Sequence, residues 1–183
     1  FFMENKGTIL VFGIPGAGKT TIIESLVQSR VDLIRVSGGS LIKKDIAEQD
    51  RDLLRKISKE SILYNQAIIV NNLRNFVNEN CGKTIIFDGH IVVKDGNKIV
   101  EVPLDIIKGL NPKKIIFIDV DPNIIFDRRA NDITRPDREK ETLSDIDRNR
   151  DLQIGICKRY GHSLGIPVFI LKSPNSNDLC ALI

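Results

Sequence analysis

Residues 13–20 are the first group whose types and spacing could do chemistry. They read Gly-Ile-Pro-Gly-Ala-Gly-Lys-Thr and follow an apolar run at 9–12. The spacing G-x-x-x-x-G-K-[ST] is typical of a P-loop, in which glycines let successive backbone N–H groups point at an oxyanion. Lys19 would add a catalytic point charge that reaches the β- and γ-phosphates, and the Thr20 hydroxyl would ligate Mg²⁺.

The nucleotide-binding residues expected from this motif are the loop itself and the residue after it. They are Gly13, Ile14, Pro15, Gly16, Ala17, Gly18, Lys19, Thr20 and Thr21. The alternative is a Gly-Pro turn with a coincidental lysine. A strand pattern before the loop and a helical apolar stripe after it favour the P-loop. We therefore expect the chain to bind a nucleoside triphosphate, ATP, together with Mg²⁺.

A carboxylate at the end of a second apolar run offers a further ligand for the metal. Residues 85–89 read Ile-Ile-Phe-Asp-Gly, so Asp88 would lie at the carboxyl end of a strand. In P-loop enzymes such an aspartate holds the Mg²⁺ shell, and we expect Asp88 to do so with Thr20. An Asp-Gly turn that merely ends the strand is the other interpretation. Asp119 also ends an apolar run and is a rival, although the Asp-Pro pair after it already indicates a helix start there.

Four arginines fall within eleven positions in the second half of the chain, at 128, 129, 135 and 138. Phosphoryl transfer spreads negative charge over the phosphate oxygens, and planar guanidinium groups that close over them stabilise it. We expect Arg128, Arg135 and Arg138 to act catalytically on a lid at about 128–140. Acidic residues are interleaved, so a solvated helix end is the alternative, and for Arg129 the two interpretations are equally good.

A third polar group lies between the second strand pattern and the next long helix. Residues 36–44 read Val-Ser-Gly-Gly-Ser-Leu-Ile-Lys-Lys, and Arg51 and Arg55 follow one helical turn apart. A Ser-Gly-Gly turn can approach a nucleotide closely, and two arginines on one helix face could clamp a phosphate. We expect an acceptor-binding segment at about 37–80. A flexible loop followed by an ordinary charged helix surface explains the same residues equally well.

The elements that must position these groups alternate along the chain. Strand patterns lie at 8–13, 33–36, 84–88, 114–120 and 167–171, and helical patterns at 19–30, 52–78, 122–131 and about 143–164. This alternation predicts an α/β P-loop fold, a doubly wound five-stranded parallel sheet with helices on both faces. Two short runs at 91–94 and 98–102 flank an Asp-Gly-Asn turn and predict a small β-hairpin insertion. The hairpin would follow Asp88 at the sheet edge where ligands bind.

Composition limits the remaining classes of function. The chain has 183 residues, of which 42% are hydrophobic and 28% charged, with a net charge of +3. We expect one domain over 3–183, starting at Met3, and no membrane segment. Aromatic residues make up only 5% and tryptophan is absent, which disfavours nucleic acid as a partner.

Cys81, Cys157 and Cys180 have no metal-ligand spacing and are typical of reduced thiols in a cytoplasmic protein. Oligomeric state is not indicated.

Taken in order, these motifs resemble those of the nucleoside monophosphate kinases and, more narrowly, of the archaeal-type adenylate kinases. Residues 13–20 match the family's loop, Phe-Asp-Gly-His at 87–90 resembles its Asp-x-His strand end, and Arg128 with Thr134-Arg135 follows its lid region. The resemblance extends from about residue 8 to residue 171. It implies reversible transfer of the γ-phosphoryl group of ATP to AMP, giving two ADP.

The resemblance also implies where individual residues act. It places Arg128 and Arg135 on the donor and transferring phosphates. The expected acceptor-binding residues are Ser37, Gly39, Lys43, Arg51, Arg55 and His90. Lys43 stands where adenylate kinases commonly have arginine, and it binds phosphate as a point charge rather than as a bidentate fork. A packed, hydrogen-bonded histidine is an equally good interpretation of His90.

Three other functions are compatible with the same residues. One is a P-loop kinase of another small metabolite. The second is a nucleotide-binding module that hydrolyses its nucleotide slowly without transfer to a monophosphate. The third is a polynucleotide kinase, which would need a basic stripe with aromatic residues for stacking.

Overall fold

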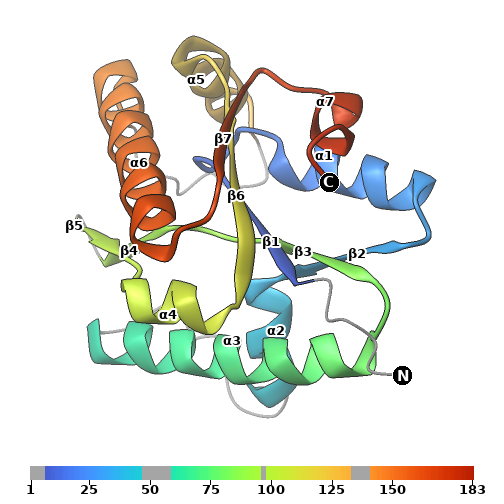
Figure 1. Cartoon of the computed structure of the whole chain (residues 1–183). Coiled ribbons are helices and arrows are strands. Elements are labelled where there is room, and N and C mark those ends of the chain that lie inside the picture. The colour runs from blue at the N-terminus through green and yellow to red at the C-terminus, as the bar shows by residue number, and fades with distance from the viewer. Residues whose placement is uncertain (1–6, 47–58, 96–97, 133–140) are drawn as a thin grey trace.

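Five parallel strands form the central sheet, in the order β2-β3-β1-β6-β7. The structure is a computed structural model that describes residues 7–46, 59–95, 98–132 and 141–183 (Figure 1). The strands are β1 (Thr8–Phe12), β2 (Leu33–Ser37), β3 (Thr84–Asp88), β6 (Pro112–Asp119) and β7 (Val168–Lys172). The predicted α/β fold with a five-stranded parallel sheet is confirmed, and the strand that precedes the glycine-rich loop lies at its centre.

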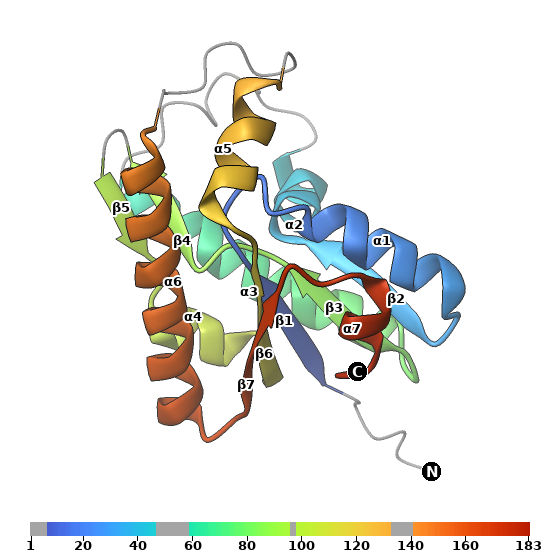
Figure 2. The same ribbon diagram turned by 90° about the horizontal axis from the view of Figure 1, so that it is seen from above.

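Helices cover both faces of this sheet, as predicted (Figures 1 and 2). On one face lie α1 (Lys19–Ser29), α5 (Pro122–Ala130) and α7 (Ser176–Cys180). On the other lie α2 (Gly38–Ile46), α3 (Lys59–Glu79) and α4 (Leu104–Gly109), while α6 (Leu143–Leu164) packs against β6 and β7. In Figure 2 the loop between β1 and α1 lies beside α5, although the two segments are more than 100 residues apart in the sequence.

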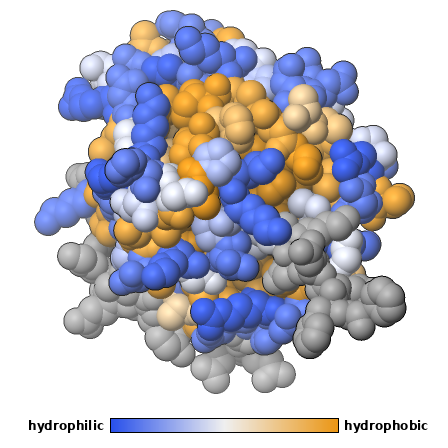
Figure 3. Space-filling model, in the orientation of Figure 1, coloured by the Kyte–Doolittle hydropathy of each residue, from blue (hydrophilic) through white to orange (hydrophobic). Residues whose placement is uncertain are grey.

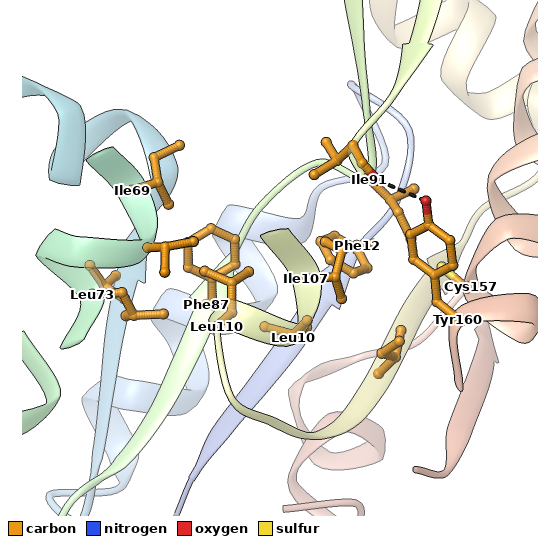
Figure 4. Close-up of a cluster of buried hydrophobic side chains, with 14 of the residues drawn as sticks. Leu10, Phe12, Ile69, Leu73, Phe87, Ile91, Ile107, Leu110, Cys157 and Tyr160 are labelled. Carbon is orange, nitrogen blue, oxygen red and sulfur yellow. Dashed lines mark hydrogen bonds between the residues drawn. The ribbon is translucent and has the colours of Figure 1, made fainter. Parts of the chain in front are cut away.

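Two apolar clusters hold the layers together, because successive strand residues point to opposite faces. In β1, Leu10 and Phe12 belong to the cluster under α3, whereas Ile9 and Val11 belong to the cluster under α1. Figure 4 shows the first cluster, and its dashed line marks the bond that the Tyr160 hydroxyl of α6 donates to a backbone carbonyl, 2.8 Å long. On the face seen in Figure 3, apolar side chains gather over β7 and α7, where the second cluster reaches the surface.

The predicted hairpin is confirmed as β4 (Val92–Asp95) paired antiparallel with β5 (Lys98–Glu101). The Thr142–Asp145 capping box starts α6 at the predicted position. The predicted helix at 52–78 corresponds to α3, and its first seven positions lie outside the described residues. The short helices α4 and α7 were not predicted.

One prediction about the acceptor segment was wrong. The Ser-Gly-Gly run was interpreted as a turn or flexible loop, but it starts α2. Ser37 N–H donates to Ser40 Oγ, and Ser40 N–H donates to Ser37 Oγ, both at 3.1 Å. This reciprocal pair satisfies the first N–H groups of the helix, as a capping box does. The Ser-x-x-Ser spacing was therefore the signal for a helix start.

Candidate active site

The loop between β1 and α1 is shaped by close packing and by backbone conformation. A Cβ atom at Gly13 would lie 2.8 Å from the carbonyl oxygen of Ile118 on β6, so only glycine fits there. Gly18 is the N-cap of α1 and has φ 81°, in the left-handed region that favours glycine. Gly18 makes no side-chain cap to α1, and the first residues of that helix line the pocket beside the loop, so an anion there could bind their uncapped N–H groups.

Lys19 is held inside this loop. Its Nζ donates a hydrogen bond of 2.9 Å to the carbonyl oxygen of Gly13, and the residue is 7% exposed. Burial lowers the pKa of Lys19 to about 8, against the attraction of the Asp88 carboxylate, which acts in the opposite direction. The ammonium is thus short of compensating negative charge until an anion binds in the loop.

Thr20 and Asp88 meet beside Lys19. The Thr20 hydroxyl donates to Asp88 Oδ2 at 2.8 Å, and Asp88 is buried. The parallel pairing of β1 with β3 sets Val11 opposite Asp88, so the carboxylate comes to the mouth of the loop. A hydroxyl and a carboxylate are the hard oxygen ligands that Mg²⁺ prefers, and they fit this metal.

Thr20 and Asp88 provide only two protein ligands, and this small number is usual for Mg²⁺. Among the described residues, no three His, Cys, Asp or Glu side chains gather into a group that could hold a metal. Mg²⁺ does not need one, because it usually takes one or two protein oxygens together with substrate phosphates and waters. Held by Thr20 and Asp88, such an ion would supply positive charge against the charge that develops on the phosphates.

The rival carboxylate, Asp119, is already paired. Arg150 of α6 donates to both of its oxygens, with Nη2 to Oδ2 at 2.8 Å, and Asp119 is 4% exposed. A carboxylate with both oxygens bound to one guanidinium does not offer them to a metal. Of the two predicted candidates, Asp88 is therefore the one placed to act as a ligand.

Arg35 of β2 is a residue of this site that sequence reasoning missed. Its Nε and Nη2 donate to Asp88 Oδ2 at 3.0 and 2.8 Å, and its Nη1 donates to Glu24 of α1 at 3.1 Å. The signal was present in the sequence, since Arg35 is a charged residue in the middle of the strand Leu-Ile-Arg-Val-Ser.

Two arginines in the last turn of α5 lie against the loop. Arg128 Nη1 donates to the Gly16 carbonyl at 3.2 Å. Arg129 Nε and Nη2 donate to the Pro15 carbonyl at 3.0 and 2.7 Å, and Arg129 also pairs with Glu141, which in turn pairs with Lys94 of the hairpin. The side chain of Arg129 is only 10% exposed. Arg129 therefore stabilises the loop and is not a solvated residue.

The loop opens into a pocket of about 920 Å³ that continues beyond Asp88. We call its two parts the P-loop end and the α2–α3 end. The P-loop end is lined by Pro15, Gly16, Ala17, Gly18, Lys19, Thr20, Thr21, Arg35, Asp88 and Arg128. The α2–α3 end is lined by Ser37, Gly38, Gly39, Ile42, Gln66, Ile69, Phe87, His90, Val93, Val102, Ile106, Ile107 and Leu110.

Some of the predicted site residues lie within the described part of the chain and others lie outside it. Ser37, Gly39 and His90, three of the predicted acceptor-binding residues, line the α2–α3 end. Lys43 belongs to α2, but its side chain lies outside the described residues, as do Arg51, Arg55, Arg135 and Arg138 entirely. The predicted lid and the charged part of the predicted acceptor segment therefore remain predictions.

Residues 12–147 match the family described as AAA domain. The chain belongs to this family. It is 28% identical over 173 residues to the adenylate kinase of Methanothermobacter thermautotrophicus, a match that covers 92% of this chain and 91% of that protein. It is 29% identical over 177 residues to the adenylate kinase of Pyrococcus horikoshii, covering 93% and 88%.

Solved structures share the fold at lower identity. Shikimate kinase from Acinetobacter baumannii, in complex with shikimate, has a TM-score of 0.59 at 15% identity and covers 96% of this chain and 89% of that one. A sugar kinase from Janibacter has a TM-score of 0.53 at 14% identity, covering 96% and 91%. The chain thus belongs to the AAA-domain family, is similar to archaeal adenylate kinases, and shares its fold with these two kinases. Over the described part of the chain, none of the helices combines the length and apolar character that a membrane span requires.

Proposed function

We propose that this protein is an ATP- and Mg²⁺-dependent nucleoside monophosphate kinase whose acceptor is AMP. The observation that carries the proposal is the continuity of the pocket. One cavity contains both the P-loop and, on the other side of Asp88, a second space walled by α2, α3 and α4. A site that only hydrolysed a nucleotide would not need that second space, whereas direct transfer requires donor and acceptor to meet in one enclosed volume.

The described residues suggest how the donor would be held. Lys19 and the N–H groups of the loop bind the β- and γ-phosphates, and Arg128 closes from α5 at the mouth of the loop. Thr20 and Asp88 hold Mg²⁺, directly or through water. Arg129 keeps the Pro15 carbonyl in place, so that the loop does not have to reorganise when the charge on the phosphates changes.

The α2–α3 end would take the acceptor. Its walls are mostly apolar, with polar groups at Ser37, Gln66 and His90, which is the usual mixture for a small-molecule site. A base can lie between the aliphatic side chains while its phosphate faces Asp88 and the loop. No general base is required, because positioning and electrostatic stabilisation supply most of the acceleration in phosphoryl transfer.

A coupled assay of ADP production tests this proposal. With ATP and Mg²⁺ held constant, AMP, CMP, UMP and GMP are offered in turn, and shikimate and simple sugars serve as metabolite acceptors. The expected result is the highest kcat/KM with AMP. Faster transfer to a metabolite, or ATP hydrolysis without transfer to any acceptor, would contradict the proposal.

A further inference from the structure

The guanidinium of Arg35 lies against Asp88 and beside the Thr20 hydroxyl, the two predicted metal ligands. Leu33, Arg35 and Ser37 alternate with Ile34 and Val36 along β2, and this alternation directs Arg35 to the α1 face of the sheet. There it meets Thr20 and Glu24, which lie one helical turn apart on α1. Arg35 therefore lies between the carboxylate of Asp88, a predicted metal ligand, and the carboxylate of Glu24.

Three hydrogen-bond donors converge on a single oxygen of Asp88. Asp88 Oδ2 accepts the Thr20 hydroxyl at 2.8 Å and two N–H groups of Arg35 at 3.0 and 2.8 Å. Arg35 Nη2 also lies 3.5 Å from Thr20 Oγ1. A cation bound to Thr20 and to this carboxylate oxygen must displace the guanidinium or share the carboxylate with it.

Glu24 gives the guanidinium a second partner. Arg35 Nη1 donates to Glu24 Oε1 at 3.1 Å, and the Glu24 side chain is 53% exposed while Asp88 is 7% exposed. Asp88 would be a costly lone charge if nothing paired with it, because burial of an unpaired carboxylate is strongly unfavourable. Arg35 supplies that pairing in the absence of metal and keeps its bond to Glu24 if it leaves Asp88.

We propose that Arg35 is a built-in counter-cation of the metal site. It neutralises Asp88 in the nucleotide-free protein and keeps the affinity for free Mg²⁺ low, so the ion enters together with the phosphates of the nucleotide. Glu24 assists by accepting the guanidinium when Asp88 turns to the metal. The inference rests on the proposed function in one respect, since it takes Thr20 and Asp88 as the metal ligands.

Metal binding to the nucleotide-free protein tests this directly, without activity as the readout. Titration calorimetry with Mg²⁺, and electron paramagnetic resonance of Mn²⁺ as a second probe, would compare wild type with Arg35→Gln. Glutamine keeps a hydrogen-bond donor near Asp88 but removes the charge. We expect the variant to bind the metal at least about tenfold more tightly, because the guanidinium charge that competes with the ion for Asp88 is gone.

Glu24→Gln should have the opposite effect and weaken metal binding, because Arg35 loses its alternative partner. In Arg35→Gln protein the same Glu24→Gln change should have a smaller effect, since no guanidinium is left to redirect. The control is Arg30→Gln, which removes an arginine paired with Asp32, away from Asp88. It should change metal affinity by less than twofold.

Arg35→Gln protein that binds Mg²⁺ no better than wild type, or shows no measurable binding, overturns the inference. So does tighter binding by Glu24→Gln. If Arg35→Gln fails to fold, Arg35→Lys takes its place, because lysine keeps the charge but not the two-pronged contact, and a smaller gain in affinity is expected. A protein that transfers phosphate to no monophosphate but shows these metal affinities would contradict the proposed function and leave the role of Arg35 standing.

Discussion

The P-loop end of the pocket is built mainly from one continuous segment, the P-loop, to which Arg35, Asp88 and Arg128 add side chains. The α2–α3 end draws on six separate elements, β2, α2, α3, β3, β4 and α4. In the first, an added Cβ at Gly13 meets a neighbouring carbonyl at 2.8 Å; in the second, an added Cβ at Gly39 meets nothing within 4 Å. The difference suggests that the P-loop end tolerates little change, while the α2–α3 end can be reshaped without loss of the fold.

The largest effect is expected at Lys19. Lys19→Gln should lower kcat by about 10²- to 10³-fold with every acceptor, because it removes a donor that stabilises the transferring charge. Initial rates with AMP and the other monophosphates are the measurement. The matched control is Lys158→Gln on the exposed face of α6, which should leave the rate unchanged. A lower rate with only one of the acceptors would contradict the proposal that Lys19 binds the donor nucleotide.

A second test concerns the support of the loop. Arg129→Gln should lower the free energy of unfolding by about 2 kcal/mol, since a charged group loses its bonds to Pro15 and Glu141 in a nearly buried position. It should also raise the KM for ATP more than the KM for the acceptor. Urea unfolding and initial rates measure both. Arg148→Gln, whose side chain is 76% exposed, is the control and should stay within about 0.5 kcal/mol of wild type.

Gly39 tests the other end of the pocket. Gly39→Leu places a side chain in open space beside Ser37 and should raise the KM for AMP by about tenfold, with the KM for ATP and the melting temperature little changed. Gly155→Leu on α6 also adds a side chain where nothing lies within 4 Å, but away from the pocket, and serves as the control. An unchanged KM for AMP in Gly39→Leu would show that AMP does not bind at the α2–α3 end.

The smallest effect is a proton taken up when ATP binds. The pKa of Lys19 is lowered to about 8, so between pH 8 and its ordinary value of 10.5 the folded, nucleotide-free protein holds fewer protons than the unfolded chain. The free energy of unfolding should therefore rise with pH across that window. Below pH 8 the destabilisation caused by burying the charged Lys19 amine is complete. Bound phosphates favour the charged amine, so binding at pH 8 should take up about half a proton.

Calorimetry in two buffers of different ionisation enthalpy measures this uptake. Lys19→Arg is the control, because a guanidinium stays protonated and should give no uptake. Equal apparent enthalpies in both buffers for wild type would show that the amine is already fully charged before ATP binds.

Much of the P-loop end could be predicted because its signals are local. The loop, the strand before it and the helix after it lie within about twenty residues, and the Asp88 strand end was readable from five residues. The start of α2 was missed although Ser37 and Ser40 carried the signal, because two glycines favour a turn when read alone. The role of Arg129 could not be predicted, since its partner Pro15 is 114 positions away in the chain.

By itself, the sequence determined that a parallel α/β sheet carries a glycine-rich P-loop, with Lys19, Thr20 and a strand-end carboxylate at its edge. It did so because hydrophobic period, glycine spacing and helix caps act over a few residues. Only the tertiary structure decided that Asp88 lies beside Thr20 while Asp119 is bound on both oxygens by Arg150, and that Arg35 pairs with Asp88. Those choices depend on strand order and on which helix packs against which strand, and charges distant in the chain interact only after the sheet has brought them together.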